Sequence, residues 1–204
     1  MKNNLIFDFE TFGNDVNEAT IINCAMMVFD WDRFATNPYT WEELVDSVVV
    51  LKMNVQEQVS KYGYKIHKGD IEWWGSHEPE VKNQIKPSKN DLTLIDFCGR
   101  MVDELTGKKV KAWWSRGNTF DPLLLQRCFT DAGQLDTMNN LLKYWLVRDI
   151  RTYLDTRFDF APDVKSGFTL PDWADKFKKH NSIHDIAADI LRMQYIERTL
   201  KGLE

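Results

Sequence analysis

Acidic side chains inside apolar segments are the residues of this sequence best placed to do chemistry. Asp8 and Glu10 lie in the apolar run 5–13, Asp121 opens a helical segment, and Asp189 lies within a C-terminal helical segment. An unpaired carboxylate is costly to bury, so a group of such residues predicts bound cations. Oxygen-only ligands favour Mg²⁺ or Mn²⁺ over zinc. The predicted chemistry is metal-assisted phosphodiester hydrolysis.

The first pair of acids has a defined geometry. Side chains alternate along a strand, so Asp8 and Glu10 are predicted to project from one face, and Phe7 and Phe9 from the other. Two acids on one face of a central strand can share a cation. The alternative is a strand end whose carboxylates simply meet water, because short Asp-x-Glu matches are common.

The third acid, Asp121, precedes Pro122, and this order is also typical of an ordinary helix N-cap. Its spacing from Leu124, Leu125 and Cys128 is helical and places it toward the buried face of the helix. A role at a metal site and a capping role both stay open on this evidence.

The predicted helix Ser182–Leu200 carries an acid in the middle of its apolar stripe. Asp189 shares a helical row with the apolar positions 186, 190 and 193. Surface helices do not normally place a carboxylate in that row, so Asp189 is predicted to be a metal ligand. Asp185 is predicted to pair with Ser182 as a cap at the helix start.

A histidine stands five residues before Asp189. His184 is then about 140° around the helix from Asp189 and about 7.5 Å along it. The two side chains can flank a site, with His184 as general base for the attacking water. The alternative for His184 is a helix-cap residue that faces solvent. The other histidines, His67, His77 and His180, are expected to be structural or exposed.

The elements that must position these residues follow from the hydrophobic pattern. Predicted strands are Leu5–Phe12, Ile21–Trp31, Ser47–Met53 and Lys109–Ser115, with Leu141–Val147 as a strand or a helix end. Predicted helices are Leu92–Leu105, Phe120–Ala132, Ile150–Arg157 and Ser182–Leu200, with short pieces at Val55–Lys61 and Asp70–Trp74. Three linked strands followed by alternating helices and strands predict an α/β fold with a mixed sheet.

Length and composition set the bounds. A chain of 204 residues without a linker or a repeat predicts a single domain over residues 1–204. No segment is apolar enough for a membrane span. Three widely spaced cysteines indicate reduced core residues in a reducing, cytoplasmic compartment. A net charge of −5 argues against nucleic-acid binding by bulk electrostatics, but bound cations would reverse the local charge of a nuclease site.

The motifs, in this order, resemble the DEDD (DnaQ-like) exonuclease superfamily. Asp8-Phe-Glu10 resembles its first motif, Phe120-Asp121 its second, and His184-x4-Asp189 the third motif of its histidine branch. The resemblance spans residues 5–200. Further matches, at residues 70–80, 116–117 and 148–152, are similar to phage exonucleases of this superfamily.

The resemblance implies a ribonuclease H-like fold and a site for two divalent cations, Mg²⁺ or Mn²⁺. Asp8 would bridge both cations, Glu10 and Asp189 would complete the first site, and Asp121 would support the second. His184 would take the proton from the attacking water, which Glu10 also orients.

The resemblance implies a 3′→5′ exonuclease that acts on 3′ ends of single-stranded DNA and releases nucleoside 5′-monophosphates. The expected substrate contacts are Thr11, Phe12, Trp73, Trp74, Phe120 and Arg116; the aromatic ones suit base stacking, which tolerates any base. Trp73 or Trp74 is expected to contact substrate and the other to pack. RNA is the alternative substrate, and an inactive nucleic-acid-binding accessory module is the alternative class. Nothing in the sequence indicates an oligomeric state.

Overall fold

A five-stranded mixed sheet is the centre of the molecule. The computed structural model describes residues 2–157 and 168–203. The strand order is β3-β2-β1-β4-β5; β1 is antiparallel to β2 and β2 to β3, whereas β4 is parallel to β1 and β5 to β4. The predicted mixed α/β sheet is therefore confirmed. The strands are β1 (Asn3–Phe12), β2 (Thr20–Asp30), β3 (Val49–Lys52), β4 (Ala112–Ser115) and β5 (Val147–Asp149).

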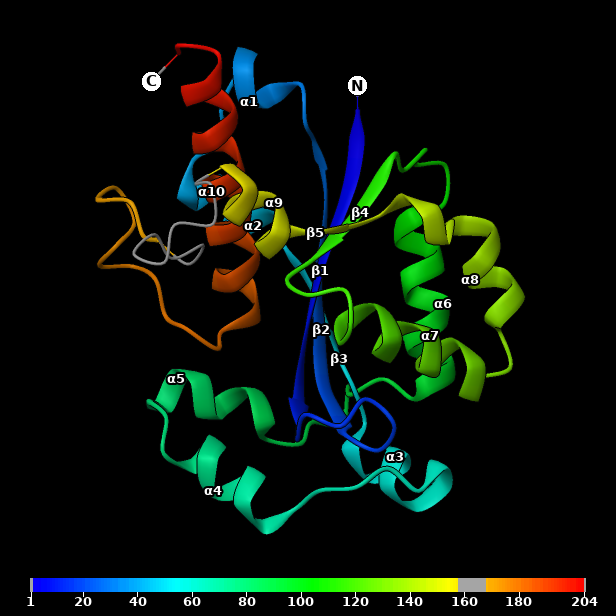
Figure 1. Cartoon of the computed structure of the whole chain (residues 1–204). Coiled ribbons are helices and arrows are strands. Elements are labelled where there is room, and N and C mark those ends of the chain that lie inside the picture. Colours follow the sequence, from blue (N-terminus) through cyan, green and yellow to red (C-terminus); the bar gives the residue numbers. More distant parts are fainter. Residues whose placement is uncertain (1, 158–167, 204) are drawn as a thin grey trace.

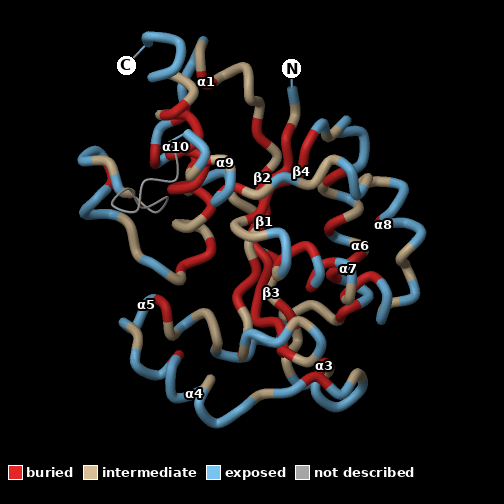
Figure 2. Tube along the Cα trace, in the orientation of Figure 1, coloured by how far each residue is buried: buried red, intermediate tan, exposed pale blue. Residues whose placement is uncertain are grey.

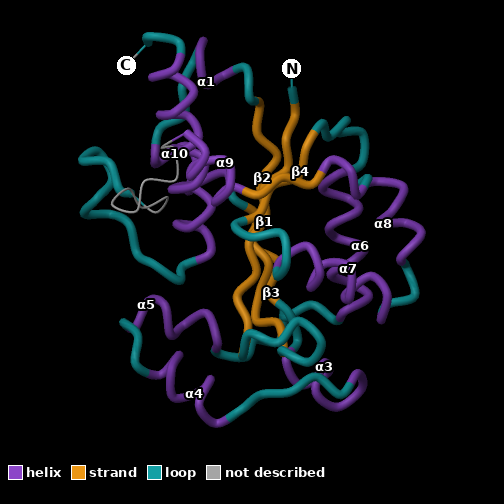
Figure 3. The backbone as a smooth tube through the Cα atoms, in the orientation of Figure 1, coloured by secondary structure: helices purple, strands orange, loops and turns teal. Residues whose placement is uncertain are grey.

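Helices cover both faces of this sheet (Figures 1 and 3). The layer on one face consists of α6 (Leu94–Leu105), α7 (Asp121–Asp131) and α8 (Leu135–Leu141). The layer on the other face consists of α1 (Arg33–Thr36), α2 (Trp41–Ser47), α9 (Ile150–Arg157) and α10 (Ser182–Leu200). Past one end of the sheet lie α3 (Val55–Tyr62), α4 (Lys68–Gly75) and α5 (Pro79–Lys82), and two 3₁₀ turns cover Asn83–Ile85 and Tyr144–Leu146.

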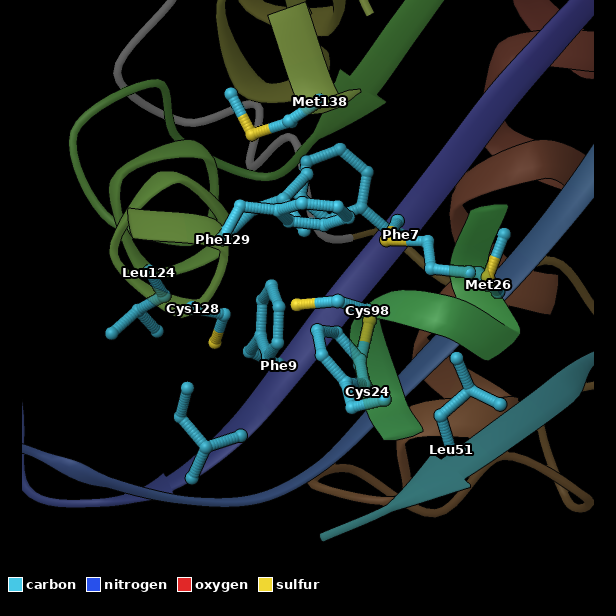
Figure 4. Close-up of a cluster of buried hydrophobic side chains, with 14 of the residues drawn as sticks. Phe7, Phe9, Cys24, Met26, Leu51, Cys98, Leu124, Cys128, Phe129 and Met138 are labelled. Atoms are coloured by element: carbon cyan, nitrogen blue, oxygen red, sulfur yellow. The ribbon is translucent and has the colours of Figure 1, made fainter. Parts of the chain in front are cut away.

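Strand β1 divides its side chains between the two layers. Leu5, Phe7 and Phe9 pack with α6, α7 and α8 in one core. Figure 4 shows Phe7 and Phe9 in this core, among three buried cysteines that carry no disulfide. Ile6 packs in the second core, against α10. The predicted alternation is confirmed, and it sends Asp8 and Glu10 toward the α10 layer.

The sheet interior is buried along its length, as the red segments of Figure 2 show. On β4, Trp113 stacks on Phe7 in one core, and Trp114 stacks on Trp31 in the other. Both tryptophans are buried. They lie on opposite faces of the sheet, one in each core.

A lobe formed by α4, α5 and the following 3₁₀ turn closes one end of the sheet. It is fixed by a small cluster of Phe12, Ile22, Trp74 and Val81. The indole Nε1 of Trp74 also donates to the carbonyl oxygen of Thr11 at 3.0 Å. The lobe is thereby held beside the end of β1, next to Glu10.

The observed elements differ from the predicted ones mainly at their ends. The strand predicted at Lys109–Ser115 begins only at Ala112, and Ser47–Met53 shortens to Val49–Lys52 because α2 extends through Ser47. Leu141–Val147 is chiefly a loop and a 3₁₀ turn. Its apolar side chains pack against the core, and its last residue, Val147, begins β5 and is paired with Trp113. No helix within the described ranges is long and apolar enough to cross a membrane.

Candidate active site

Three carboxylates meet where β1 passes beneath α10. Ligand oxygens of Asp8, Glu10 and Asp185 all lie within 4.8 Å of one another. Asp8 and Glu10 come from the same face of β1, and Asp185 comes from the first turn of α10. The fold therefore joins residues separated by more than half of the chain.

A fourth carboxylate, that of Asp121, approaches from the opposite layer. Asp121 begins α7 and is 4% exposed. Its Oδ1 accepts a hydrogen bond from the backbone N–H of Phe9 at 3.0 Å. This bond fixes Asp121 against β1 between Asp8 and Glu10, so the residue is not simply a helix cap facing solvent.

The cluster is electrostatically strained without a counter-charge. Burial, together with the neighbouring carboxylates, raises the pKa of Asp8 and of Glu10 well above the usual range. Burial raises the pKa of Asp121 to about 7, and the Phe9 hydrogen bond opposes this shift. Burial and the charge of Asp189 raise the pKa of Asp185 to about 7. Like charges in a poorly solvated site resist ionisation together.

The donor set fits divalent cations. It contains only carboxylate oxygens, which suit Mg²⁺ or Mn²⁺. The raised pKa values of Asp8, Glu10, Asp121 and Asp185 show that this site lacks enough positive charge of its own. Cations among the four carboxylates would supply it.

Asp189, predicted as a ligand, is engaged by two arginines. Arg116 donates through Nε at 3.0 Å to Oδ2 and through Nη2 at 2.5 Å to Oδ1. Arg192 donates through Nη1 at 2.7 Å to Oδ1. Asp189 is 4% exposed, as its place in the apolar stripe predicts. Its carboxylate is paired with arginines within the protein, whereas that of Asp185 joins Asp8 and Glu10, so the structure groups Asp185 and not Asp189 with the strand carboxylates.

His184, predicted as the base, lies in different surroundings. Its ring makes an edge-on contact with Trp41, at 5.2 Å between centroids, and its Nδ1 accepts from the backbone N–H of Lys178 at 3.1 Å. It lines a shallow hollow with Glu42 and Glu80 on the α2 side of α10. His184 is thus half-buried against α2 and is not part of the carboxylate group.

His180, expected to be structural or exposed, is instead the histidine beside the carboxylates. It lies two residues before α10, and its backbone N–H donates to the carboxylate of Asp185. Its ring contacts that of Trp73, with centroids 4.8 Å apart. Burial, Lys179 and His77 lower its pKa, which keeps the imidazole neutral.

The signal that could have identified His180 and Asp185 is present in the sequence. His180 and Asp185 have the same five-residue separation as His184 and Asp189. The two pairs differ in relation to the helix start at Ser182, because only His180 precedes it.

A pocket of about 450 Å³ opens beside Glu10. Its walls include four of the predicted substrate contacts, Thr11, Trp73, Trp74 and Phe120. Trp73 is 45% exposed, in contrast to 1% for Trp74. Trp73 is therefore the tryptophan available for stacking, and Trp74 is the one that packs.

Two other predicted contacts lie elsewhere. Phe12 is buried in the cluster that fixes the lobe and does not line the pocket, because β1 turns its side chain toward Ile22 and Trp74. Arg116 is partly buried and its guanidinium is engaged by Asp189. Arg116 therefore contacts the carboxylate of Asp189 and does not line the pocket.

Comparison with known proteins agrees with this arrangement. Residues 3–196 match the model of the Rv2179c-like family, described as a 3′-5′ exoribonuclease domain. The exodeoxyribonuclease of Enterobacteria phage T4 is 32% identical, over 98% of this chain and 91% of that protein.

Solved exonuclease I structures have a similar fold. That of E. coli exonuclease I with a dT13 oligonucleotide matches with a TM-score of 0.63 at 15% identity. It covers 100% of this chain and 42% of that one. Exonuclease I of Methylocaldum szegediense gives a TM-score of 0.64 at 16% identity, covering 99% of this chain and 41% of that one. The present chain therefore spans about two fifths of these proteins.

These matches confirm the predicted ribonuclease H-like fold and the resemblance to DEDD exonucleases. The family match extends over nearly the whole chain, and it includes every carboxylate of the site. The chain belongs to the family of Rv2179c-like 3′-5′ exoribonuclease domains.

Proposed function

We propose that this protein is a divalent-metal-dependent 3′→5′ exonuclease of single-stranded DNA that releases nucleoside 5′-monophosphates. The observation that carries the proposal is the convergence of Asp8, Glu10 and Asp185 next to a pocket with an exposed aromatic wall. Such a pocket suits the terminal nucleotide of a strand end, and the carboxylates then adjoin the phosphodiester bond that links this nucleotide to the chain.

Asp8, Glu10 and Asp185 would hold one cation, and Asp121 would support a second with Asp8. Bound there, two divalent cations supply stabilisation of the charge on the attacking and leaving oxygens of an in-line displacement. The protein holds the carboxylates in place through β1, the start of α7 and the start of α10.

His180 takes the proton from the attacking water. Its lowered pKa keeps the imidazole neutral and able to accept a proton near neutral pH. The bond from its backbone N–H to Asp185 ties the position of the base to that of a ligand. Trp73 and Phe120 hold the terminal base by stacking, and Thr11 lines the same pocket.

DNA is proposed over RNA because the phage T4 relative, named an exodeoxyribonuclease, matches over 91% of its length. The family description names an exoribonuclease, and this favours RNA as the second candidate. The full set of four carboxylates, of which Glu10 and Asp121 are buried, argues against the inactive accessory module, since a dead site would not retain this strained cluster. Three buried, unpaired cysteines suit the reducing cytoplasm.

The test compares DNA and RNA oligomers of one sequence, labelled at the 5′ end so that shortening from the 3′ end gives a ladder. With Mg²⁺ or Mn²⁺, the DNA ladder should form faster, and the released product should be the 5′-monophosphate. A circular single strand should survive. Faster digestion of RNA would reverse the substrate assignment, and rapid cutting of the circle would indicate an endonuclease.

A further inference from the structure

The backbone at His180 is held in an unusual conformation. Among the non-glycine residues that the structure describes, only His180 has a positive φ, 63°. Side-chain-bearing residues rarely adopt this conformation unless their surroundings fix it. The next residue, Asn181, caps α10 by accepting a hydrogen bond from the N–H of Ile183. A contact other than the Asn181 cap must therefore hold the backbone at His180.

Gln84, in the 3₁₀ turn that follows α5, makes that contact. Its Nε2 donates to the carbonyl oxygen of His180 at 2.8 Å. Its Oε1 accepts from Nδ2 of Asn23 at 3.2 Å and lies 3.5 Å from the hydroxyl oxygen of Ser182. One side chain thus joins the sheet, the lobe and the segment that bears His180.

The anchor of this link lies directly beside the metal site. Asn23 is on β2, is 2% exposed and is paired with Glu10 in the sheet register. The path Asn23–Gln84–His180 therefore ties the histidine to β2, the strand paired with the one that carries Asp8 and Glu10. The exposed ion pair between Glu80 and Lys178 ties the lobe to the same segment a second time.

We propose that Gln84 is a positioning residue that sets the orientation of the general base His180. Gln84 acts through the main chain of His180 and touches neither the pocket walls nor the carboxylate cluster. This inference rests on the proposed function, because it takes His180 as the base. It adds a role for the lobe: α4 and α5 supply the pocket wall, and the turn after them aligns the base.

Two variants separate the bonds of Gln84. Gln84→Met keeps the length of the side chain and removes every hydrogen bond. Gln84→Glu keeps an acceptor for Asn23 and Ser182 but loses the donor to His180. Gln56→Glu is the matched control, because Gln56 is exposed on α3, away from the site, and undergoes the same charge change.

Both Gln84 variants should lower kcat by about 10–100-fold, the usual effect of losing a partner that orients a catalytic group. In both variants, KM for a DNA oligomer and Mn²⁺ binding by calorimetry should stay unchanged. In Gln56→Glu, kcat, KM and Mn²⁺ binding should all stay unchanged. Wild-type kcat in Gln84→Glu would overturn the inference, because this variant lacks the donor through which Gln84 is proposed to orient His180.

A spectrum gives a readout that does not depend on turnover. The protein has four histidines, so their imidazole Cε1–H signals are assigned by single substitutions. The His180 signal should shift or broaden in Gln84→Met, whereas that of His67, which lies against Glu18, should not. An unchanged His180 signal would contradict the inference.

A double variant distinguishes failure of this inference from failure of the proposed function. If Gln84 acts through His180, Gln84→Met should cause no further loss of kcat in a His180→Ala background. An equal loss in both backgrounds would assign Gln84 a general structural role. If His180→Ala alone keeps wild-type kcat, His180 is not the base, and it is the proposed function that fails.

Discussion

Two histidine–aspartate pairs with the same spacing overlap at the start of α10, and their surroundings differ. His180 lies before the helix beside Trp73, and Asp185 joins Asp8 and Glu10. His184 packs on Trp41, and Asp189 is held by two arginines. In the proposed function, the first pair serves proton transfer and metal binding, whereas the second pair makes packing and ion-pair contacts.

The difference follows from the geometry of the helix start. A histidine inside the helix points in the direction that its helical position sets, whereas one before the helix can turn toward the site. Asp185 in the first turn lies close to the end of β1, where Glu10 is. Asp189, one turn farther along α10, faces Arg116 and Arg192 instead.

The largest effect that separates the two pairs should be on metal binding. Asp185→Asn removes a carboxylate from the cluster, so activity with Mg²⁺ should fall by more than about 10²-fold, beyond the usual effect of losing an outer-shell partner. Calorimetric titration with Mn²⁺ should show weaker binding. Asp189→Asn, the matched change, should keep Mn²⁺ binding. The opposite ranking would restore Asp189 as the ligand.

The two histidines should differ next. His180→Ala should lower kcat by about 10²–10⁴-fold, as expected for the loss of a general base, with Mn²⁺ binding retained. His184→Ala should cost stability through the lost Trp41 contact and leave kcat close to that of the wild type. Rates on a 5′-labelled DNA oligomer near neutral pH measure both. Equal losses in the two variants would mean that neither environment identifies the base.

Much of the fold could be predicted because it depends on patterns that act locally. Alternation along β1 placed Phe7 and Phe9 in the core and Asp8 and Glu10 on the other face, and helical spacing placed Asp121 and Asp189 in buried positions. The mixed sheet and α10 followed from the same patterns, whereas the family followed from the resemblance of the motifs. Asp8 and Glu10 also lie together as their alternation predicts.

The register of the third motif could not be settled in this way. His180 and His184 both precede an aspartate by five residues, and only the tertiary contacts decide between them. The arginine partners of Asp189 show the limit of the reasoning: the burial of Asp189 was predicted, but its pairing with Arg116, 73 residues away in sequence, was not. The burial of Phe12, which was expected to contact substrate, shows the same limit, because it depends on a lobe that follows some 60 residues later in the sequence.

A smaller effect concerns the buried ion pairs of Asp189. In Asp189→Asn, Arg192 loses its charged partner while its side chain is only 5% exposed. Breaking a buried pair costs about 3–5 kcal/mol, and in a chain of this size each kcal/mol lowers Tm by about 2–4 °C. Asp185→Asn removes a strained carboxylate and should leave metal-free Tm unchanged or raised. A lower Tm for Asp185→Asn than for Asp189→Asn, measured by calorimetry without metal, would contradict this comparison.

The smallest effect is the pH dependence of the metal-free protein. The pKa of Asp185 rises from 3.8 to about 7 on folding, so the folded state favours the protonated carboxyl. This contribution to stability is complete below the unfolded pKa and is lost as pH rises through the folded pKa. Asp121 acts in the same direction. Metal-free Tm should therefore fall between about pH 4 and about pH 7, whereas Mn²⁺, which binds the ionised carboxylates, should raise Tm most at the higher pH. The metal-free slope should be shallower in Asp185→Asn than in the wild type. If Asp185→Asn keeps the wild-type slope while Asp189→Asn flattens it, the strained carboxylate is Asp189, and the roles of the two pairs must be exchanged.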